Sequence, residues 1–135
     1  MTNFIKTVLL IDDNEIDNIL NKKIIVNNNF AENIIVMQSA EDALAFLKNE
    51  SIESDLIPDL IFLDLRMPLI DGFEFLEAFK NLPDEILKKT KIAMLTSSID
   101  HEDHSQAIEN KFVQFLLSKP LSVEALENLR NKLHL

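Results

Sequence analysis

The chain has 135 residues, near the commonest size of a single domain, and it is 47% hydrophobic and 27% charged. One glycine and four prolines indicate an ordered globular protein and exclude a disordered or fibrous one. The formal net charge of −10 would repel a nucleic-acid backbone, so we expect no nucleic acid among the partners.

The amino-terminal region shows no targeting signal. Its apolar stretch, Val8 to Ile11, is preceded by Lys6 and ended by Asp12-Asp13, far short of the apolar region of a signal peptide. No window approaches the ~18 apolar residues that span a bilayer. The chain also has no cysteine, which fits a reducing compartment. We therefore predict a cytoplasmic protein without membrane association, with one domain over residues 1–135 and no separate effector domain.

Five short apolar runs alternate with longer segments of helical periodicity. This alternation is typical of βαβ units around a parallel sheet. Continuous apolar character suits strands that are covered by helices on both faces. The predicted strands are Thr7–Ile11, Ile34–Met37, Leu60–Leu63, Ile92–Leu95 and Phe112–Leu117. The fold class is therefore predicted to be α/β, with a doubly wound sheet of five parallel strands.

Five helices are predicted from their first residues, where a side-chain oxygen can accept a hydrogen bond from the first turn. The start signals are Asn14 with Glu15 and Asp17, Ser39 with Asp42, Asp71 with Glu74, Asp100 with Asp103, and Ser122 with Glu124. Apolar spacing predicts the buried faces Ala43, Leu44 and Leu47, then Phe75, Leu76 and Phe79, then Val123, Leu126, Leu129 and Leu133. The segment from Asn49 to Pro58 is interpreted as a loop, and the last helix is expected to reach the final residue.

Polar residues that directly follow the apolar runs are the candidates for a site, because ligands of open α/β sheets bind beyond the carboxyl ends of the strands. They are Asp12 and Asp13 after the first run, Asp64 after the third, Thr96 after the fourth and Lys119 after the fifth. Three carboxylates at one sheet edge repel each other unless a cation lies between them. The donors are all oxygens, with no His or Cys nearby in sequence, which favours Mg²⁺ over zinc.

These residues suit phosphoryl transfer. A carboxylate can attack a phosphoryl donor to give an acyl phosphate when the charge on the transferring oxygens is neutralised. Mg²⁺, the ammonium of Lys119 and the hydroxyl of Thr96 are suited to that neutralisation. Taken alone, each residue also has an ordinary interpretation: a solvated loop or helix cap for the acidic pair, a cap neighbour for Thr96, and a turn lysine for Lys119. Their joint occurrence at strand ends, in the order that one pocket requires, favours the functional interpretation.

Four motifs of this sequence resemble the CheY-like receiver domains of bacterial two-component signalling, and the resemblance covers nearly the whole chain. The motifs are VLLIDD at residues 8–13, IFLDLRMPLIDG at 61–72, MLTS at 94–97 and SKP at 118–120. The resemblance implies a flavodoxin-like fold with strand order 2-1-3-4-5. It also implies a single-domain response regulator.

The resemblance implies a role for each acidic residue of the motifs. Asp64 would be the phosphoacceptor, and Asp13 and Asp64 would bind Mg²⁺ directly. Asp12 would act on the metal largely through a bound water. The backbone carbonyl two residues past the acceptor, which belongs to Arg66 here, would be a further metal ligand.

The resemblance also implies how the phosphoryl group is held and delivered. Lys119 would pair with it, Thr96 would shift to hydrogen-bond it in the activated state, and the Lys119-Pro120 bond would be cis. The donor would be a phosphohistidine on a sensor histidine kinase or a histidine phosphotransfer protein. The chain would catalyse the transfer and its own slow dephosphorylation. It is thus predicted to be a signalling switch and not a conventional enzyme, which either changes its binding to an unknown downstream protein or relays phosphate.

The fifth predicted strand departs from the family pattern. Many receivers have an aromatic residue three positions before the lysine, but that position is Leu116 here and the aromatic is Phe115. Successive strand residues point to opposite faces, so Phe115 is no simple substitute, and Phe112 or a leucine rearrangement would have to replace it. Arg66 and Ser98 are expected to flank the pocket and to tune hydrolysis through the attacking water.

Three alternatives remain beside this interpretation. His101 and His104 have helical spacing that loosely resembles a metal site, although a solvated helix explains them better because no third ligand is evident. A haloacid-dehalogenase-type phosphotransferase would need a second aspartate two residues after the nucleophile, where this chain has Arg66. The last alternative is a receiver-like interaction module that is never phosphorylated.

Overall fold

The structure is a computed structural model that describes residues 3–49, 51–97 and 100–133. Within these residues, five parallel strands form a sheet in the order β2-β1-β3-β4-β5, which confirms the strand order that the resemblance implied. The strands are β1 (Ile5–Ile11), β2 (Ala31–Met37), β3 (Leu60–Asp64), β4 (Lys91–Thr96) and β5 (Val113–Ser118).

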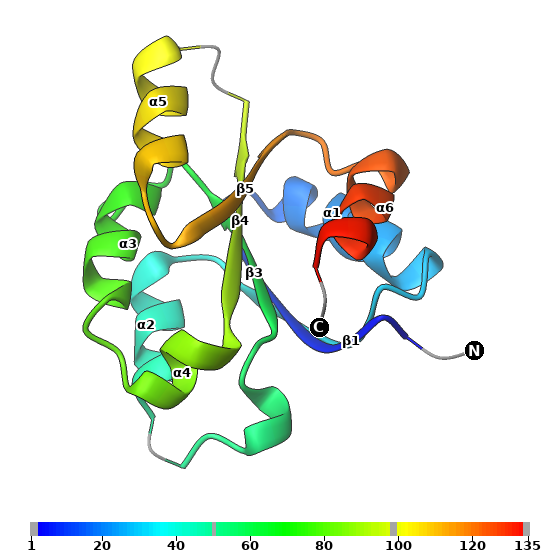
Figure 1. Cartoon of the computed structure of the whole chain (residues 1–135), viewed down its shortest axis with the longest axis horizontal. Coiled ribbons are helices and arrows are strands. Elements are labelled where there is room, and N and C mark those ends of the chain that lie inside the picture. The colour runs from blue at the N-terminus through cyan, green and yellow to red at the C-terminus, as the bar shows by residue number, and fades with distance from the viewer. Residues whose placement is uncertain (1–2, 50, 98–99, 134–135) are drawn as a thin grey trace.

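Helices cover both faces of the sheet, as Figure 1 shows, with α1 and α6 on one face and α2, α3, α4 and α5 on the other. The helices are α1 (Glu15–Asn27), α2 (Ala40–Lys48), α3 (Gly72–Phe79), α4 (Asp84–Lys89), α5 (His101–Glu109) and α6 (Val123–Lys132). A 3₁₀-helix, Ser54–Leu56, lies inside the predicted loop from Asn49 to Pro58. None of the described helices combines the length and apolar character needed to cross a bilayer.

Two hydrophobic clusters, one on each face of the sheet, hold the three layers together. Alternate residues of one strand enter different clusters: Leu9 packs with Phe75 and Phe79 of α3, whereas Leu10 packs with Ile25 of α1. All residues of β3 are buried, as expected for the central strand of a sheet that is covered on both faces. Each fully buried side chain of this size contributes about 1.5–3 kcal/mol of transfer free energy.

All five predicted helix starts are confirmed by their N-caps, including Ser122 of α6, whose side chain accepts a hydrogen bond from the N–H of Ala125. The side chains of Asn14 and Ser39 accept hydrogen bonds from the backbone N–H three residues further on. Asp71 forms a full capping box, because its side chain accepts from the Glu74 backbone while the Glu74 side chain accepts from the Asp71 N–H. Helix α5 also begins at its predicted cap residue, where the side chain of Asp100 accepts a hydrogen bond from the N–H of Glu102.

The structure also corrects some boundaries and one face. Helix α4 was not predicted, because it follows Pro83, has six residues and buries only Ile86, which leaves no periodicity to detect. Strand β2 begins at Ala31, three residues before the predicted start; the prediction missed these residues because Glu32 and Asn33 interrupt the apolar run of this edge strand. Val123 is exposed, so the buried face of α6 is formed by Leu126 and Leu129.

Candidate metal centre

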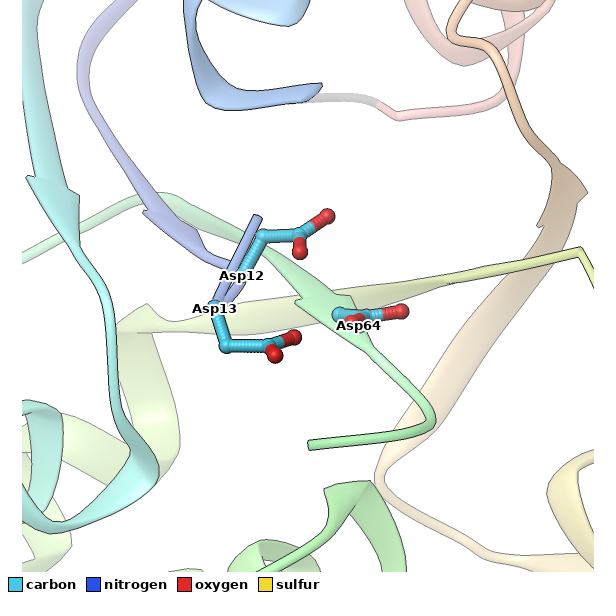
Figure 2. A group of neighbouring side chains, drawn as sticks. All are labelled: Asp12, Asp13 and Asp64. Atoms are coloured by element: carbon cyan, nitrogen blue, oxygen red, sulfur yellow. The ribbon is translucent and has the colours of Figure 1, made fainter. Parts of the chain in front are cut away.

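The three predicted carboxylates lie together at the carboxyl edge of the sheet. β1 and β3 are neighbours with Ile11 paired to Leu63, so the residues at their ends meet. One carboxylate oxygen from each of Asp12, Asp13 and Asp64 lies within 4.8 Å of the other two. Figure 2 shows the three side chains turned toward the same space. Asp12 and Asp64 are only 3% and 5% exposed, whereas Asp13 is exposed to solvent.

Lys119 reaches this cluster from the end of β5. Its Nζ lies 2.7 Å from Asp12 Oδ2, 2.9 Å from Asp64 Oδ1 and 3.1 Å from Asp17 Oδ2. The side chain is 14% exposed. The peptide bond between Lys119 and Pro120 is cis, as the resemblance implied. Sequence reasoning missed the contact with Asp17, which it interpreted only as an acid in the first turn of a helix.

Burial perturbs the ionisation of both partners in the closest pair. Desolvation, aided by the charge of Asp12, raises the pKa of Asp64 from 3.8 to about 7 even though the hydrogen bond from Lys119 lowers it. Desolvation also favours the neutral amine of Lys119, but the hydrogen bonds and charges of Asp12 and Asp64 outweigh it and raise the pKa of the ammonium. Lys119 therefore stays charged, and Asp64 carries an unfavourable buried charge when it is ionised.

The donor set fits a hard divalent cation. The cluster holds three carboxylates, and the ammonium of Lys119 contacts two of them, so the cluster keeps a net negative charge when its acids are ionised. All the clustered ligand atoms are carboxylate oxygens, which Mg²⁺ prefers and Zn²⁺ does not. A dication bound here would stabilise the ionised form of Asp64 that burial disfavours.

Asp12 is held in place by the start of α1. Its Oδ1 accepts a hydrogen bond of 2.9 Å from the N–H of Asn14, and its carbonyl accepts one of 2.8 Å from the buried side chain of Asn18. Thr96, at the end of β4, is buried, and its carbonyl accepts a hydrogen bond of 3.0 Å from the N–H of Lys119. The structure thus brings Thr96 and Lys119 to the same edge as the acids, as predicted.

The loop after Asp64 is closed tightly by the only glycine of the chain. The N–H of Gly72 donates to the carbonyl of Leu65 at 2.8 Å. A Cβ at Gly72 would lie 2.8 Å from the Asp64 carbonyl oxygen and 3.0 Å from Leu65 Cα, closer than real contacts allow. Glycine is therefore required for the first turn of α3 to pack against the backbone that carries Asp64.

Arg66 extends from this loop toward α5. Its Nη2 lies 2.7 Å from both carboxylate oxygens of Asp103, which is buried, while the arginine side chain is 62% exposed. Asp103 and Ala107 are the residues of α5 that are buried. The sequence interpretation of Asp103 as part of a helix cap gave no sign of this ion pair.

The remaining predicted residues lie apart from the acidic cluster. In the part of the chain that is described, no group of three or more metal-ligating side chains includes His101 or His104. Phe115 packs with the cluster beneath α1 and α6, whereas Leu116 packs on the opposite face, as strand alternation predicted. Phe112 precedes β5 and packs edge-on against Phe79, with ring centroids 5.4 Å apart. Ser98 lies outside the described residues.

The chain matches the family model of the response regulator receiver domain over residues 8–131 and belongs to that family. It is similar to the crystal structure of a two component response regulator from Cytophaga hutchinsonii, with 35% identity, a TM-score of 0.81, and 94% and 95% of the two chains covered. It is 32% identical to response regulator Rcp1 of Synechocystis over 73% of this chain and 66% of Rcp1. It is also 29% identical to the sensor histidine kinase CheAY of Helicobacter pylori over 88% of this chain and 14% of the kinase.

The chain is therefore a receiver domain of two-component response regulators with a CheY-like fold. Asp12, Asp13 and Asp64 form an acidic cluster that is consistent with phosphorylation-dependent switching. The matched region is a small part of CheAY and just under two thirds of Rcp1, so the activities of those whole proteins are not carried over to this chain.

Proposed function

We propose that the chain accepts a phosphoryl group on Asp64, with Mg²⁺ bound by Asp12, Asp13, Asp64 and the backbone carbonyl of Arg66. The observation that supports this assignment is the placement of Asp64. It is the cluster member that is buried at the end of the central strand, with Asp12 and Asp13 beside it and the ammonium of Lys119 2.9 Å from its Oδ1. Mg²⁺ would neutralise the phosphoryl oxygens during transfer.

The proposed reaction is a transfer from a phosphohistidine. An oxygen of Asp64 forms a bond to phosphorus, while the bond between phosphorus and the imidazole nitrogen breaks and its electron pair stays on that nitrogen. Lys119 exchanges its contact with Asp64 Oδ1 for a contact with a phosphoryl oxygen. The hydroxyl of Thr96 donates a hydrogen bond to another phosphoryl oxygen. Hydrolysis reverses the modification when water attacks phosphorus and the bond to the Asp64 oxygen breaks. The chain thus promotes both transfer and its own dephosphorylation, and it acts as a switch and not as a conventional enzyme.

The proposed partner is a sensor histidine kinase or a histidine phosphotransfer protein, in line with the similarity to a segment of a histidine kinase. Such a donor must cover the rim of the site to bring its histidine within bonding distance of Asp64. The rim next to Lys119 is formed by α1, where Ile16, Ile19 and Leu20 are exposed apolar side chains. An apolar patch beside the reacting carboxylate suits a protein partner better than a small molecule.

The downstream partner of the proposed switch is a further protein, not a nucleic acid or a membrane, because the net charge of −10 opposes phosphate-rich surfaces. The proposed setting of this exchange is the cytoplasm. The addition of roughly −1.5 to −2 charges at Asp64 would bias the nearby elements between two arrangements.

The first experiment tests the acceptor. The wild-type chain, incubated with a small acyl phosphate and Mg²⁺, is expected to gain the mass of one phosphoryl group, and Asp64→Asn is expected to abolish that gain. Asp84→Asn, which changes an acid in α4 that lies outside the cluster, is the matched control and should be labelled like the wild type. Labelling of Asp64→Asn at full yield would place the acceptor elsewhere. A wild-type chain that is never labelled would instead favour a module without phosphorylation.

The second experiment tests the metal ligands. Asp13→Ala is expected to weaken Mg²⁺ binding by about tenfold or more, because it removes one charged oxygen donor from the set. Glu15→Ala, which removes an exposed acid two residues later, controls for the loss of net charge. Mg²⁺ titrations of the two variants by calorimetry measure the difference. Equal affinities would contradict the proposed ligand set.

A haloacid-dehalogenase-type phosphotransferase is not proposed. Its acid/base aspartate would stand at position 66, where the side chain is an arginine that pairs with Asp103. The membership of the receiver family supports the same conclusion.

A further inference from the structure

We propose that Asp17 is a positioning residue that aims the ammonium of Lys119 at the phosphoryl group, an inference that rests on the proposed function. An ammonium has three N–H donors and no acceptor. In this structure three carboxylate oxygens lie around Lys119 Nζ, those of Asp12, Asp64 and Asp17, at 2.7, 2.9 and 3.1 Å. The ammonium donates hydrogen bonds to Asp12 and Asp17 and forms an ion pair with Asp64, so these three carboxylates together define its position.

The three acceptors have different fates in the reaction. The oxygen of Asp64 is replaced by a phosphoryl oxygen, whereas Asp12 and Asp17 keep their carboxylates. Asp12 belongs to the proposed metal site and is fixed by the Asn14 N–H and the Asn18 side chain. Asp17 has no place in the metal cluster, and it approaches Lys119 from α1. Two donors thus remain bound while the third points at the reacting group.

A cavity beside Lys119 makes this restraint necessary. A depression of about 210 Å³ is lined by the side chains of Asp17, Leu20, Asn21, Ser97, Lys119 and Pro120. The four-carbon stem of a lysine has many rotamers, and an open space next to it lets the ammonium leave its reactive position. The carboxylate of Asp17 stands at the wall of that cavity and binds the ammonium on the cavity side.

A purely helical role for Asp17 does not account for the contact. An acid in the first turn of α1 is favoured by the helix dipole, and the N–H of Asp17 is bound by the cap residue Asn14. Glu15 meets the same electrostatic preference two residues earlier in the first turn of α1, and its side chain is exposed. The two acids therefore form a matched pair that differs in the contact with Lys119.

The test compares two substitutions that remove the same charge. Asp17→Ala removes the acceptor and the charge, whereas Asp17→Asn removes the charge but keeps an amide oxygen for Lys119. A small acyl phosphate at saturating Mg²⁺ is the donor. A bond forms between an Asp64 oxygen and phosphorus, and the bond from phosphorus to the acyl oxygen breaks, so that the free carboxylate leaves. Because the carboxylate of Asp17 is partly exposed, the loss of this hydrogen bond predicts a rate about three- to tenfold lower in Asp17→Ala, and Asp17→Asn should keep most of the wild-type rate.

Three controls make each outcome decisive. Glu15→Ala should react like the wild type, and Asp17→Ala and Asp17→Asn should bind Mg²⁺ equally because they carry the same charge. Equal rates in Asp17→Ala and Asp17→Asn would show an effect of charge alone and overturn the proposal. A much weaker Mg²⁺ affinity in Asp17→Ala than in Asp17→Asn would show a disrupted site and overturn it as well. If Asp17→Ala does not fold, Asp17→Leu removes the same acceptor with a strong helix former.

Labelling of the wild-type chain distinguishes a failure of the proposed function from a failure of the role of Asp17. If the wild type is labelled and Asp17→Ala is labelled equally fast, only the role of Asp17 fails. If the wild type is never labelled, the proposed function fails, and the positioning role falls with it.

Discussion

Two cations are associated with Asp64, Lys119 through a direct contact and Arg66 through its position two residues later, and the protein holds them in opposite ways. Lys119 is largely buried and is surrounded by three carboxylates from two segments of the chain. Arg66 is mostly exposed and is bound by a single carboxylate, that of Asp103 in α5. The first arrangement fixes a positive charge beside Asp64, the proposed phosphoacceptor, and the second connects the loop after Asp64 with a helix.

The two arrangements differ in what they contribute to stability. Buried charges interact strongly because the surrounding dielectric is low, and the removal of one partner leaves the others uncompensated. Exposed ion pairs are screened by solvent and typically contribute about 0–1 kcal/mol. We therefore expect changes at Lys119 to alter stability, metal binding and chemistry together, and changes at Arg66 or Asp103 to alter mainly the behaviour of α5.

The largest effect is predicted for Lys119→Met. Without its ammonium, the ionised carboxylates of Asp12 and Asp64 repel each other, and the free energy of unfolding in metal-free buffer should fall by about 2 kcal/mol. Mg²⁺ should bind more tightly than to the wild type, because a competing positive charge is gone, while phosphorylation slows. Urea denaturation with and without Mg²⁺ checks both effects. If the variant is as stable as the wild type without metal, the charge of Lys119 contributes no more to stability than an exposed ion pair does, and the prediction is wrong.

A smaller effect is predicted for pH. Burial raises the pKa of Asp64 to about 7, so below that pH a proton competes with Mg²⁺ for the carboxylate. The apparent Mg²⁺ affinity should fall by up to about tenfold per pH unit below pH 7 and level off above it. Without metal the sign for stability is the reverse: the raised pKa stabilises the fold most below about pH 4, and this contribution is lost as the pH rises through about 7.

Titrations of Mg²⁺ across this pH range measure the first effect, and thermal unfolding of the metal-free chain measures the second. Asp64→Asn has no proton to exchange at that position and should lose both dependences. If the wild-type chain binds Mg²⁺ with the same affinity at every pH, Asp64 is solvated. The contrast between a buried site at Lys119 and an exposed one at Arg66 would then be wrong.

The smallest effect on stability is predicted for Asp103→Asn. The pair with Arg66 is partly exposed, so its loss should lower the free energy of unfolding by less than about 1 kcal/mol. Amide hydrogen exchange in α5 should nevertheless become faster, because Asp103 and Ala107 are the buried residues of that helix. Glu77→Gln, which breaks the exposed pair with Lys80, is the control and should leave α5 unchanged. Unchanged exchange in Asp103→Asn would show that Arg66 does not hold the helix.

The sequence was sufficient to predict the elements that have a regular apolar pattern and the residues that lie at the ends of strands. The central strands gave continuous apolar runs, and the polar residues at the ends of β1, β3, β4 and β5 lie at one edge of the sheet, as predicted from the parallel arrangement of the strands. The strand order itself came from the family resemblance. Positions such as Leu116 and Phe115 were assigned correctly to opposite faces, because strand alternation leaves no other choice.

The sequence was insufficient where a residue type has a common local explanation. Asp17 and Asp103 both look like ordinary acids in the first turn of a helix, yet they bind Lys119 and Arg66 across the fold. Their partners lie 102 and 37 residues away in sequence, so no local pattern reports the contacts. Helix α4 was missed for a related reason, because six residues with one buried side chain show no helical periodicity.

The close packing of Gly72 against Asp64 has a consequence for how a metal would enter. The first turn of α3 presses on the backbone of Asp64 and Leu65, and the hydrogen bond from Gly72 to Leu65 closes the segment between them into a ring. The backbone of Arg66, whose carbonyl is a proposed metal ligand, lies within that ring, so fewer conformations are open to it before an ion binds. Such a restraint would favour Mg²⁺ binding without a prior rearrangement of the loop.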